Sequence, residues 1–225
     1  MRSESVVAVA LAAALAITVP GCGTDERILG NVVDPQLLAA VTKFRSCCGH
    51  SFAVGESNRT MKHYLVPKPS FIGGDHALPV HAPCDGKITS ISPEEHRLDC
   101  LGGAVRGDQV RIVCRARPDV SVRIFHVNPT RGPGSVDSGE LLGYADLRAC
   151  NPDGGSLYAD IDVSVEKLAS MYSYIEWLDD GAFGAWAARG LSSRDAAIVG
   201  KAERDANPCN YQDYLMCQAD TITFP

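Results

Sequence analysis

Three side chains of this 225-residue chain have the types and spacing of a metal site: His126, Asp160 and Asp162. Asp160 and Asp162 are two positions apart in a segment that alternates apolar and polar residues, so they share one face of the strand expected there. His126 lies near the end of another alternating segment and could reach that face from a neighbouring strand. One imidazole and two carboxylates can bind a divalent metal, and Asp75 or His76 could add a further ligand.

The same residues also have a structural interpretation. The two aspartates could lie at a solvated strand edge, with His126 making a local hydrogen bond. The sequence favours this second interpretation, because a single histidine is more often structural than catalytic. His50 and His63 are interpreted in the same way. No catalytic residue is therefore assigned, and His126 is the one candidate.

Motifs for other kinds of catalysis are missing from the chain. It contains no Gly-x-Ser-x-Gly nucleophile elbow. Gly102-Gly103 lacks the Lys-Ser/Thr that follows a phosphate-binding loop. The cysteines are better used in disulfides, which leaves no thiolate nucleophile.

The nine cysteines indicate an oxidising compartment. Setting Cys22 aside leaves an even number, which can form up to four disulfides. These are Cys47, Cys48, Cys84, Cys100, Cys114, Cys150, Cys209 and Cys217. Adjacent Cys47 and Cys48 cannot easily pair with each other, so each is expected to join a distant cysteine. A zinc knuckle is not supported, because the chain has no Cys-x-x-Cys pair.

The N-terminus predicts export from the cell. Arg2 precedes the uncharged apolar run 6–19, so residues 1–21 have the pattern of a signal peptide. The ending Val19-Pro20-Gly21-Cys22 resembles a bacterial lipobox. This implies lipidation of Cys22, a tether over residues 22–33, and a membrane-anchored lipoprotein in the periplasm or on the cell surface. The alternative is ordinary secretion, with Cys22 in a discarded or frayed segment.

Charge and length narrow the classes of function further. A net charge of −6 and a pI near 5.5, without a basic cluster, argue against a nucleic-acid partner. The mature length of about 200 residues fits one domain with appendages.

Short alternating segments predict a sheet-rich core over residues 34–165. Asp85-Gly86 predicts a β-hairpin within 79–91. Strands are also expected at 61–67, 109–115, 120–127 and 157–165. Helices are predicted at 34–45, 167–178 and 193–206, with another short helix beginning at Asp180. Residues 166–225 are expected to pack on the core as an extension, attached through Cys209 and Cys217.

Four of these segments together resemble the lysostaphin-type (LytM-like) zinc metallopeptidases and their duplicated-hybrid-motif relatives. They are residues 79–88 (PVHAPCDGKI), the paired strands 110–113 and 123–127, the turn 136–143 (VDSGELLG) and the strand 160–165 (DIDVSV). The resemblance covers about residues 75–165. The predicted fold class is therefore mainly β: a LytM-like barrel or sandwich, with a short N-terminal helix and a helical tail stapled by disulfides.

The resemblance does not extend to the family's zinc ligands. Family members bind zinc through a His and an Asp before the hairpin and a His on the last strand. Residues 67–71 offer neither of the first two ligands, and Asp160 and Asp162 stand at the positions of the last-strand histidines. His126 is the one residue that matches the family's catalytic set.

The resemblance thus implies a non-catalytic domain, a pseudoenzyme that binds peptidoglycan or regulates an envelope partner. No cofactor is expected, with Zn²⁺ the one candidate. Two alternatives remain open. One is a divergent metal-dependent peptidoglycan endopeptidase that uses His126, Asp160 and Asp162. The other is a hybrid-barrel transport-adaptor module, ranked last because the chain has no long coiled-coil segment.

Overall fold

The computed structural model describes residues 27–94, 107–148 and 160–225. The expected signal peptide, the expected lipidation site Cys22, and Cys100 and Cys150 lie outside these ranges. Among the described residues, no helix has the length and apolar character needed to cross a membrane.

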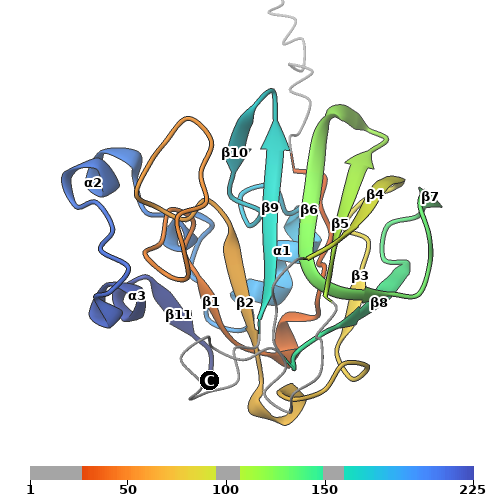
Figure 1. The fold of residues 1–225 in the computed structure, drawn as a ribbon, viewed down its shortest axis with the longest axis horizontal. Coiled ribbons are helices and arrows are strands. Elements are labelled where there is room, and N and C mark those ends of the chain that lie inside the picture. Colours follow the sequence, from red (N-terminus) through yellow and green to blue (C-terminus); the bar gives the residue numbers. More distant parts are fainter. Residues whose placement is uncertain (1–26, 95–106, 149–159) are drawn as a thin grey trace, which may run out of the picture.

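One 11-stranded antiparallel sheet dominates the described residues (Figure 1). Its main path runs in the order β11-β1-β2-β9-β6-β5-β4-β7, while β10 pairs with β9, and β8 pairs with both β3 and β6. The strands are β1 (Leu38–Thr42), β2 (His63–Pro67), β3 (Pro79–His81), β4 (Gly86–Pro93), β5 (Asp108–Cys114), β6 (Arg117–Pro129), β7 (Gly134–Val136), β8 (Leu141–Ala145), β9 (Ile161–Lys167), β10 (Ser170–Tyr172) and β11 (Thr221–Thr223). The mainly-β expectation is confirmed.

Among the described residues, the helices are few and short. They are α1 (Asp180–Ala187), α2 (Lys201–Ala206) and α3 (Tyr214–Ala219), with single 3₁₀ turns at Pro35–Leu37, Pro69–Phe71 and Asp195–Ala197. Figure 1 shows α2 and α3 beside β11 and β1 at one end of the sheet, and β4 and β7 at the other end. The C-terminal residues therefore extend the sheet with β10 and β11 as well as packing on it.

The core lies under the inner face of the sheet, where the alternating apolar residues of the middle strands meet. Ile112, Ile124 and Val163 on β5, β6 and β9 are fully buried. Burial of such a side chain contributes about 1.5–3 kcal/mol. Leu29 and Val32, expected in a tether, are also fully buried, and Val32 N donates to the Tyr174 hydroxyl at 2.9 Å. The described part of the expected tether, up to residue 33, therefore belongs to the folded body.

The predicted helix at 34–45 is wrong. Asp34 does cap a turn, since its carboxylate accepts from Gln36 N at 2.9 Å, but the turn is a single 3₁₀ turn. The chain then enters β1, which pairs with β2 on one side and β11 on the other. Two strand partners that are distant in sequence override the local helical spacing.

The predicted hairpin within 79–91 is also wrong, because β3 and β4 do not pair with each other. β3 pairs with β8, while β4 pairs with β5 and β7. Gly86 is needed for close strand approach rather than for a hairpin turn: a Cβ there would lie 2.2 Å from the Val113 carbonyl oxygen.

The helix predicted at 167–178 is replaced by a strand pair. Leu168 (φ 49°) and Ala169 (φ 60°) form a two-residue turn between β9 and β10, and Met171 pairs with Glu166. The helix predicted at 193–206 is split into the 3₁₀ turn Asp195–Ala197 and α2. The short helix at Asp180 is confirmed as α1, although Asp179 supplies its cap by accepting from Ala182 N at 2.7 Å.

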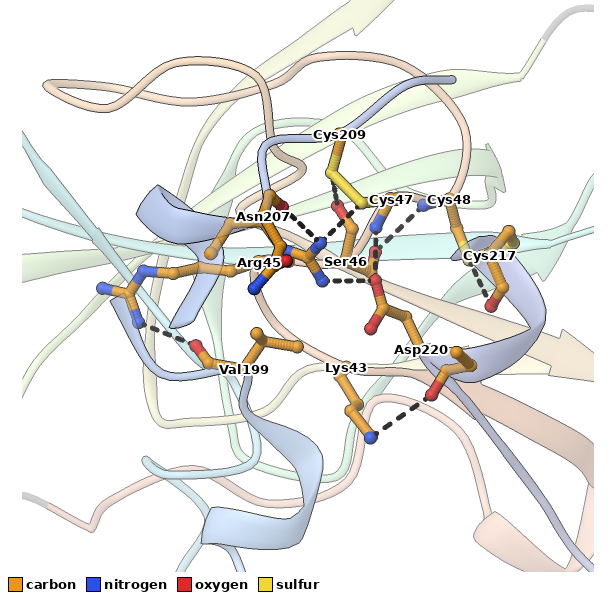
Figure 2. A network of polar contacts seen from close by, with 12 residues as sticks. Lys43, Arg45, Ser46, Cys47, Cys48, Val199, Asn207, Cys209, Cys217 and Asp220 are labelled. Carbon is orange, nitrogen blue, oxygen red and sulfur yellow. Dashed lines mark hydrogen bonds and ion pairs between the residues drawn. A yellow bond between two sulfur atoms is a disulfide. The ribbon is translucent and has the colours of Figure 1, made fainter. Parts of the chain in front are cut away.

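Three disulfides join the described cysteines: Cys47–Cys209, Cys48–Cys217 and Cys84–Cys114. Cys47 and Cys48 thus pair with distant cysteines, as expected, and Cys209 and Cys217 fasten the C-terminal segment. Figure 2 shows Asp220 beside the cysteines of the Cys47–Cys209 and Cys48–Cys217 disulfides. Its carboxylate accepts from Cys47 N at 2.8 Å and from the buried Arg204 guanidinium at 2.6 Å. The loop 46–60 and the C-terminus are therefore held as one unit.

Candidate functional site

His126, Asp160 and Asp162 converge in the structure. One ligand atom from each lies within 4.8 Å of the other two, and all three side chains are buried. β9 lies between β2 and β6, so the aspartates are at an interior strand and not at a solvated edge. That part of the favoured structural interpretation is wrong. His126 Nδ1 lies 3.0 Å from the Asp160 carbonyl oxygen, a partner 34 residues away in the sequence.

A β-bulge positions His126. The register between β5 and β6 shifts between the pairs Asp108–Val127 and Val110–Ile124, so β6 carries an extra residue there. His126 has a φ of 65°, in the left-handed region that costs a non-glycine residue about 1–2 kcal/mol. Bulges re-aim side chains in this way. As a result, the His126 ring faces Asp160, whose Oδ1 is also 3.0 Å from Nδ1.

A lysine that the sequence did not point to completes the cluster. The Lys62 ammonium forms an ion pair with the Asp162 carboxylate, and only 3% and 1% of these side chains are exposed. Tyr64 lies directly opposite Asp162 in the β2–β9 pairing. The rings of Phe52, Tyr64 and Phe125 surround the ammonium at 4.8–4.9 Å. Aromatic faces attract a desolvated cation, so the structure holds a positive charge at this point.

Carboxylates outnumber cations around this ammonium. Burial raises the pKa of Asp162, and Asp160 raises it further, while Lys62 opposes the change. Glu94 adds a third carboxylate, with Oε2 at 3.3 Å from His126 Nε2. Partial burial and the nearby Lys62 lower the pKa of His50, at the opening of the cluster.

The other two proposed ligands lie in a separate group. Asp75 bonds to the neighbouring His76 at 2.7 Å and to Arg148 at 3.0 Å. The His76 ring lies against Tyr144, with centroids 5.9 Å apart. The metal-capable group found among the described residues does not include either of them.

Sequence reasoning missed Lys62, Glu94 and Phe52. Lys62 and Asp162 are 100 residues apart, and only the β2–β9 pairing brings them together. Phe52 comes from the loop 46–60, whose position depends on the two C-terminal disulfides. Lys62 and Tyr64 are two positions apart, before and within β2, and side chains two apart in a strand share a face. This spacing was the one signal in the sequence that placed them together.

A catalytic zinc ion does not fit this set of donors well. Such a site needs metal-facing ligands and an open position for water. Here the ammonium of Lys62 already neutralises Asp162, both nitrogens of His126 lie near carboxylate oxygens, and the three donors are buried. The arrangement can hold an internal cation and order the loop above it.

No protein-family model and no curated protein matches the chain. Solved structures similar to it include the SpoIIQ–SpoIIIAH pore-forming complex and a crystal structure of the SpoIIIAH and SpoIIQ complex. The first match has a TM-score of 0.43 and 13% identity over 68% of this chain and 92% of the other. The second match has a TM-score of 0.42 and 14% identity over 64% of this chain and 95% of the other. Similarity at this level carries no argument about function.

Proposed function

We propose that this chain is an exported cell-envelope protein whose LytM-like sheet binds peptidoglycan without cleaving it. The observation that supports the proposal is the buried Lys62–Asp162 ion pair. A lysine ammonium supplies the positive charge at the point where an active relative would need a metal. It cannot activate a water molecule as a metal does. The protein then has a face that binds peptidoglycan but no activity that hydrolyses it.

The binding face is the side of the sheet that carries Asp162. Side chains at Asp162, Ser164 and Glu166 share this face, because successive residues of a strand alternate between faces. Loop 46–60 covers the Asp162 end, where Phe52 packs edge-on against Phe125 at 5.7 Å. Past that loop, an open cleft of about 400 Å³ extends over Arg123 and Glu166. A polymer strand could lie along this cleft.

Co-sedimentation with purified insoluble peptidoglycan tests the binding proposal, with insoluble chitin as the control polysaccharide. The wild-type protein is expected in the peptidoglycan pellet and in the chitin supernatant. Recovery in both supernatants would contradict the proposal. The membrane anchor is tested separately, since replacing Cys22→Ser should release the protein from the membrane fraction if Cys22 is lipidated.

A second candidate function is a divergent metal-dependent endopeptidase. It is favoured by one observation, the convergence of His126, Asp160 and Asp162 within 4.8 Å. Zymography on cell-wall substrate with added Zn²⁺ distinguishes the two functions. The binding proposal predicts no clearing by wild type or by His126→Ala. Clearing by wild type that disappears in His126→Ala would establish the endopeptidase instead.

A further inference from the structure

Two arginines face each other on the open part of the binding face. Arg111 on β5 and Arg123 on β6 are directly paired across the strands. Like charges in this position repel and destabilise a sheet unless a counter-charge is present. Both line the cleft of about 400 Å³, so neither is covered by the core.

One carboxylate serves both guanidinium groups. Glu166 on β9 bonds to Arg123 through Oε1 at 2.5 Å and to Arg111 through Oε2. The three side chains thus carry a net charge of +1 in a protein whose net charge is −6. Among the described residues, Arg123 Nε finds no hydrogen-bond partner, so Glu166 does not satisfy every donor of this guanidinium.

The cleft wall beside these arginines is formed by apolar side chains, and the backbone of one turn in it is strained. Leu168 is 80% exposed and Val54 is 45% exposed, and both line the cleft. The turn that presents Leu168 has left-handed φ values at Leu168 and Ala169, where Asn and Gly are the residues of lowest cost. Strain of this kind is commonly kept at binding sites. A positively charged floor therefore adjoins an exposed aliphatic wall.

We infer that Arg111 and Arg123 bind the free carboxylate of a short peptide whose terminal side chain is small and apolar. The guanidinium forks match the planar geometry of a carboxylate, and Glu166 bridges the two groups in the free protein. The aliphatic side chains of Leu168 and Val54 contact the peptide's methyl groups. This inference rests on the proposed function, because stem peptides of peptidoglycan have this chemistry.

Calorimetry with N-acetyl-D-alanyl-D-alanine and its C-terminal amide tests the inference at low ionic strength. The carboxylate is expected to bind about tenfold more tightly than the amide. Arg123→Gln and Arg111→Gln should each weaken binding of the carboxylate about tenfold, and Arg123→Lys less than Arg123→Gln. Glu166→Gln should tighten it several-fold, since the competing internal carboxylate is gone. Arg131→Gln is the matched control, because Arg131 bonds to Glu140 outside the cleft.

The outcomes separate this inference from the proposed function. Equal binding of acid and amide, or full affinity in folded Arg123→Gln and Arg111→Gln proteins, overturns the carboxylate site. If wild type then still sediments with peptidoglycan, the proposed function stands without this site. If the dipeptide binds through Arg123 but peptidoglycan does not, the site stands and the proposed function fails.

Discussion

The Lys62 ammonium and the Asp162 carboxylate form an ion pair beneath three aromatic rings, at the centre of the one metal-capable group among the described residues. The two residues come from the adjacent strand segments around β2 and β9. Their pairing determines what the neighbouring His126 and Asp160 can do. A buried pair stabilises little as a whole, but removing one partner leaves an uncompensated charge.

The Lys62→Met variant is expected to lose about 3–5 kcal/mol of unfolding free energy at pH 7, because Asp162 would remain buried and unpaired. Urea denaturation followed by circular dichroism measures this loss. The exposed Lys87→Met change is the control and should stay within about 0.5 kcal/mol of wild type. The double variant Lys62→Met with Asp162→Leu should recover most of the loss. A single variant as stable as wild type would contradict the pairing.

His63 predicts a distinct dependence of stability on pH. Its side chain is fully buried, its Nδ1 lies 2.7 Å from the Thr42 carbonyl oxygen, and burial lowers its pKa to about 4. Because the unfolded chain takes up the proton first, this group's stabilisation is complete above about pH 6.5 and is lost as the pH falls to about 4. The loss is about 3 kcal/mol.

Comparing wild type with His63→Asn isolates this effect from the titration of carboxylates. Unfolding free energies are measured between pH 7 and pH 4. The decrease should be about 3 kcal/mol larger in wild type than in the variant. Parallel pH profiles would show that His63 titrates normally.

Asp220 lies beside the disulfides of Cys47 and Cys48, and its carboxylate accepts a hydrogen bond from Cys47 N (Figure 2). Asp220→Asn removes the charge that pairs with buried Arg204 and is expected to cost about 3 kcal/mol. Thermal unfolding under non-reducing conditions measures the change. Asp213→Asn, at an exposed helix cap, is the control and should cost about 1 kcal/mol or less. Equal effects at both positions would argue against a structural role for the Arg204–Asp220 pair.

The turn between β9 and β10 is expected to accept stabilising changes. Replacing Leu168→Asn and Ala169→Gly together should raise the unfolding free energy by about 1–2 kcal/mol, because both residues have left-handed φ values. Ala116→Gly, in the β5–β6 turn where no left-handed φ occurs, should destabilise slightly. Lower stability of the double variant would show that Leu168 contributes more through packing than it loses through strain.

The sequence predicted the strands better than the helices. Alternation located β5, β6 and β9, and Asp160 and Asp162 were correctly placed on one face with His126 within reach. Residues 34–45 and 167–178 were predicted as helices because their apolar spacing is helical, yet strand partners from distant parts of the chain decide their conformation. Local spacing cannot contain that information.

Only some residues of the site could be predicted from the sequence. Three donors could be proposed from residue types, whereas Lys62 became relevant only when β2 was seen beside β9. The disulfide partners of Cys47 and Cys48 were likewise undetermined, although their separation from each other was expected. Those contacts depend on chain topology rather than on local pattern.

Isothermal titration of Zn²⁺ into the purified wild-type protein tests the central claim most directly. If Lys62 supplies the cation of this cluster, no binding tighter than about millimolar should be observed at pH 7. Micromolar binding that is lost in both His126→Ala and Asp162→Asn would contradict the claim, and would make the cluster a metal site.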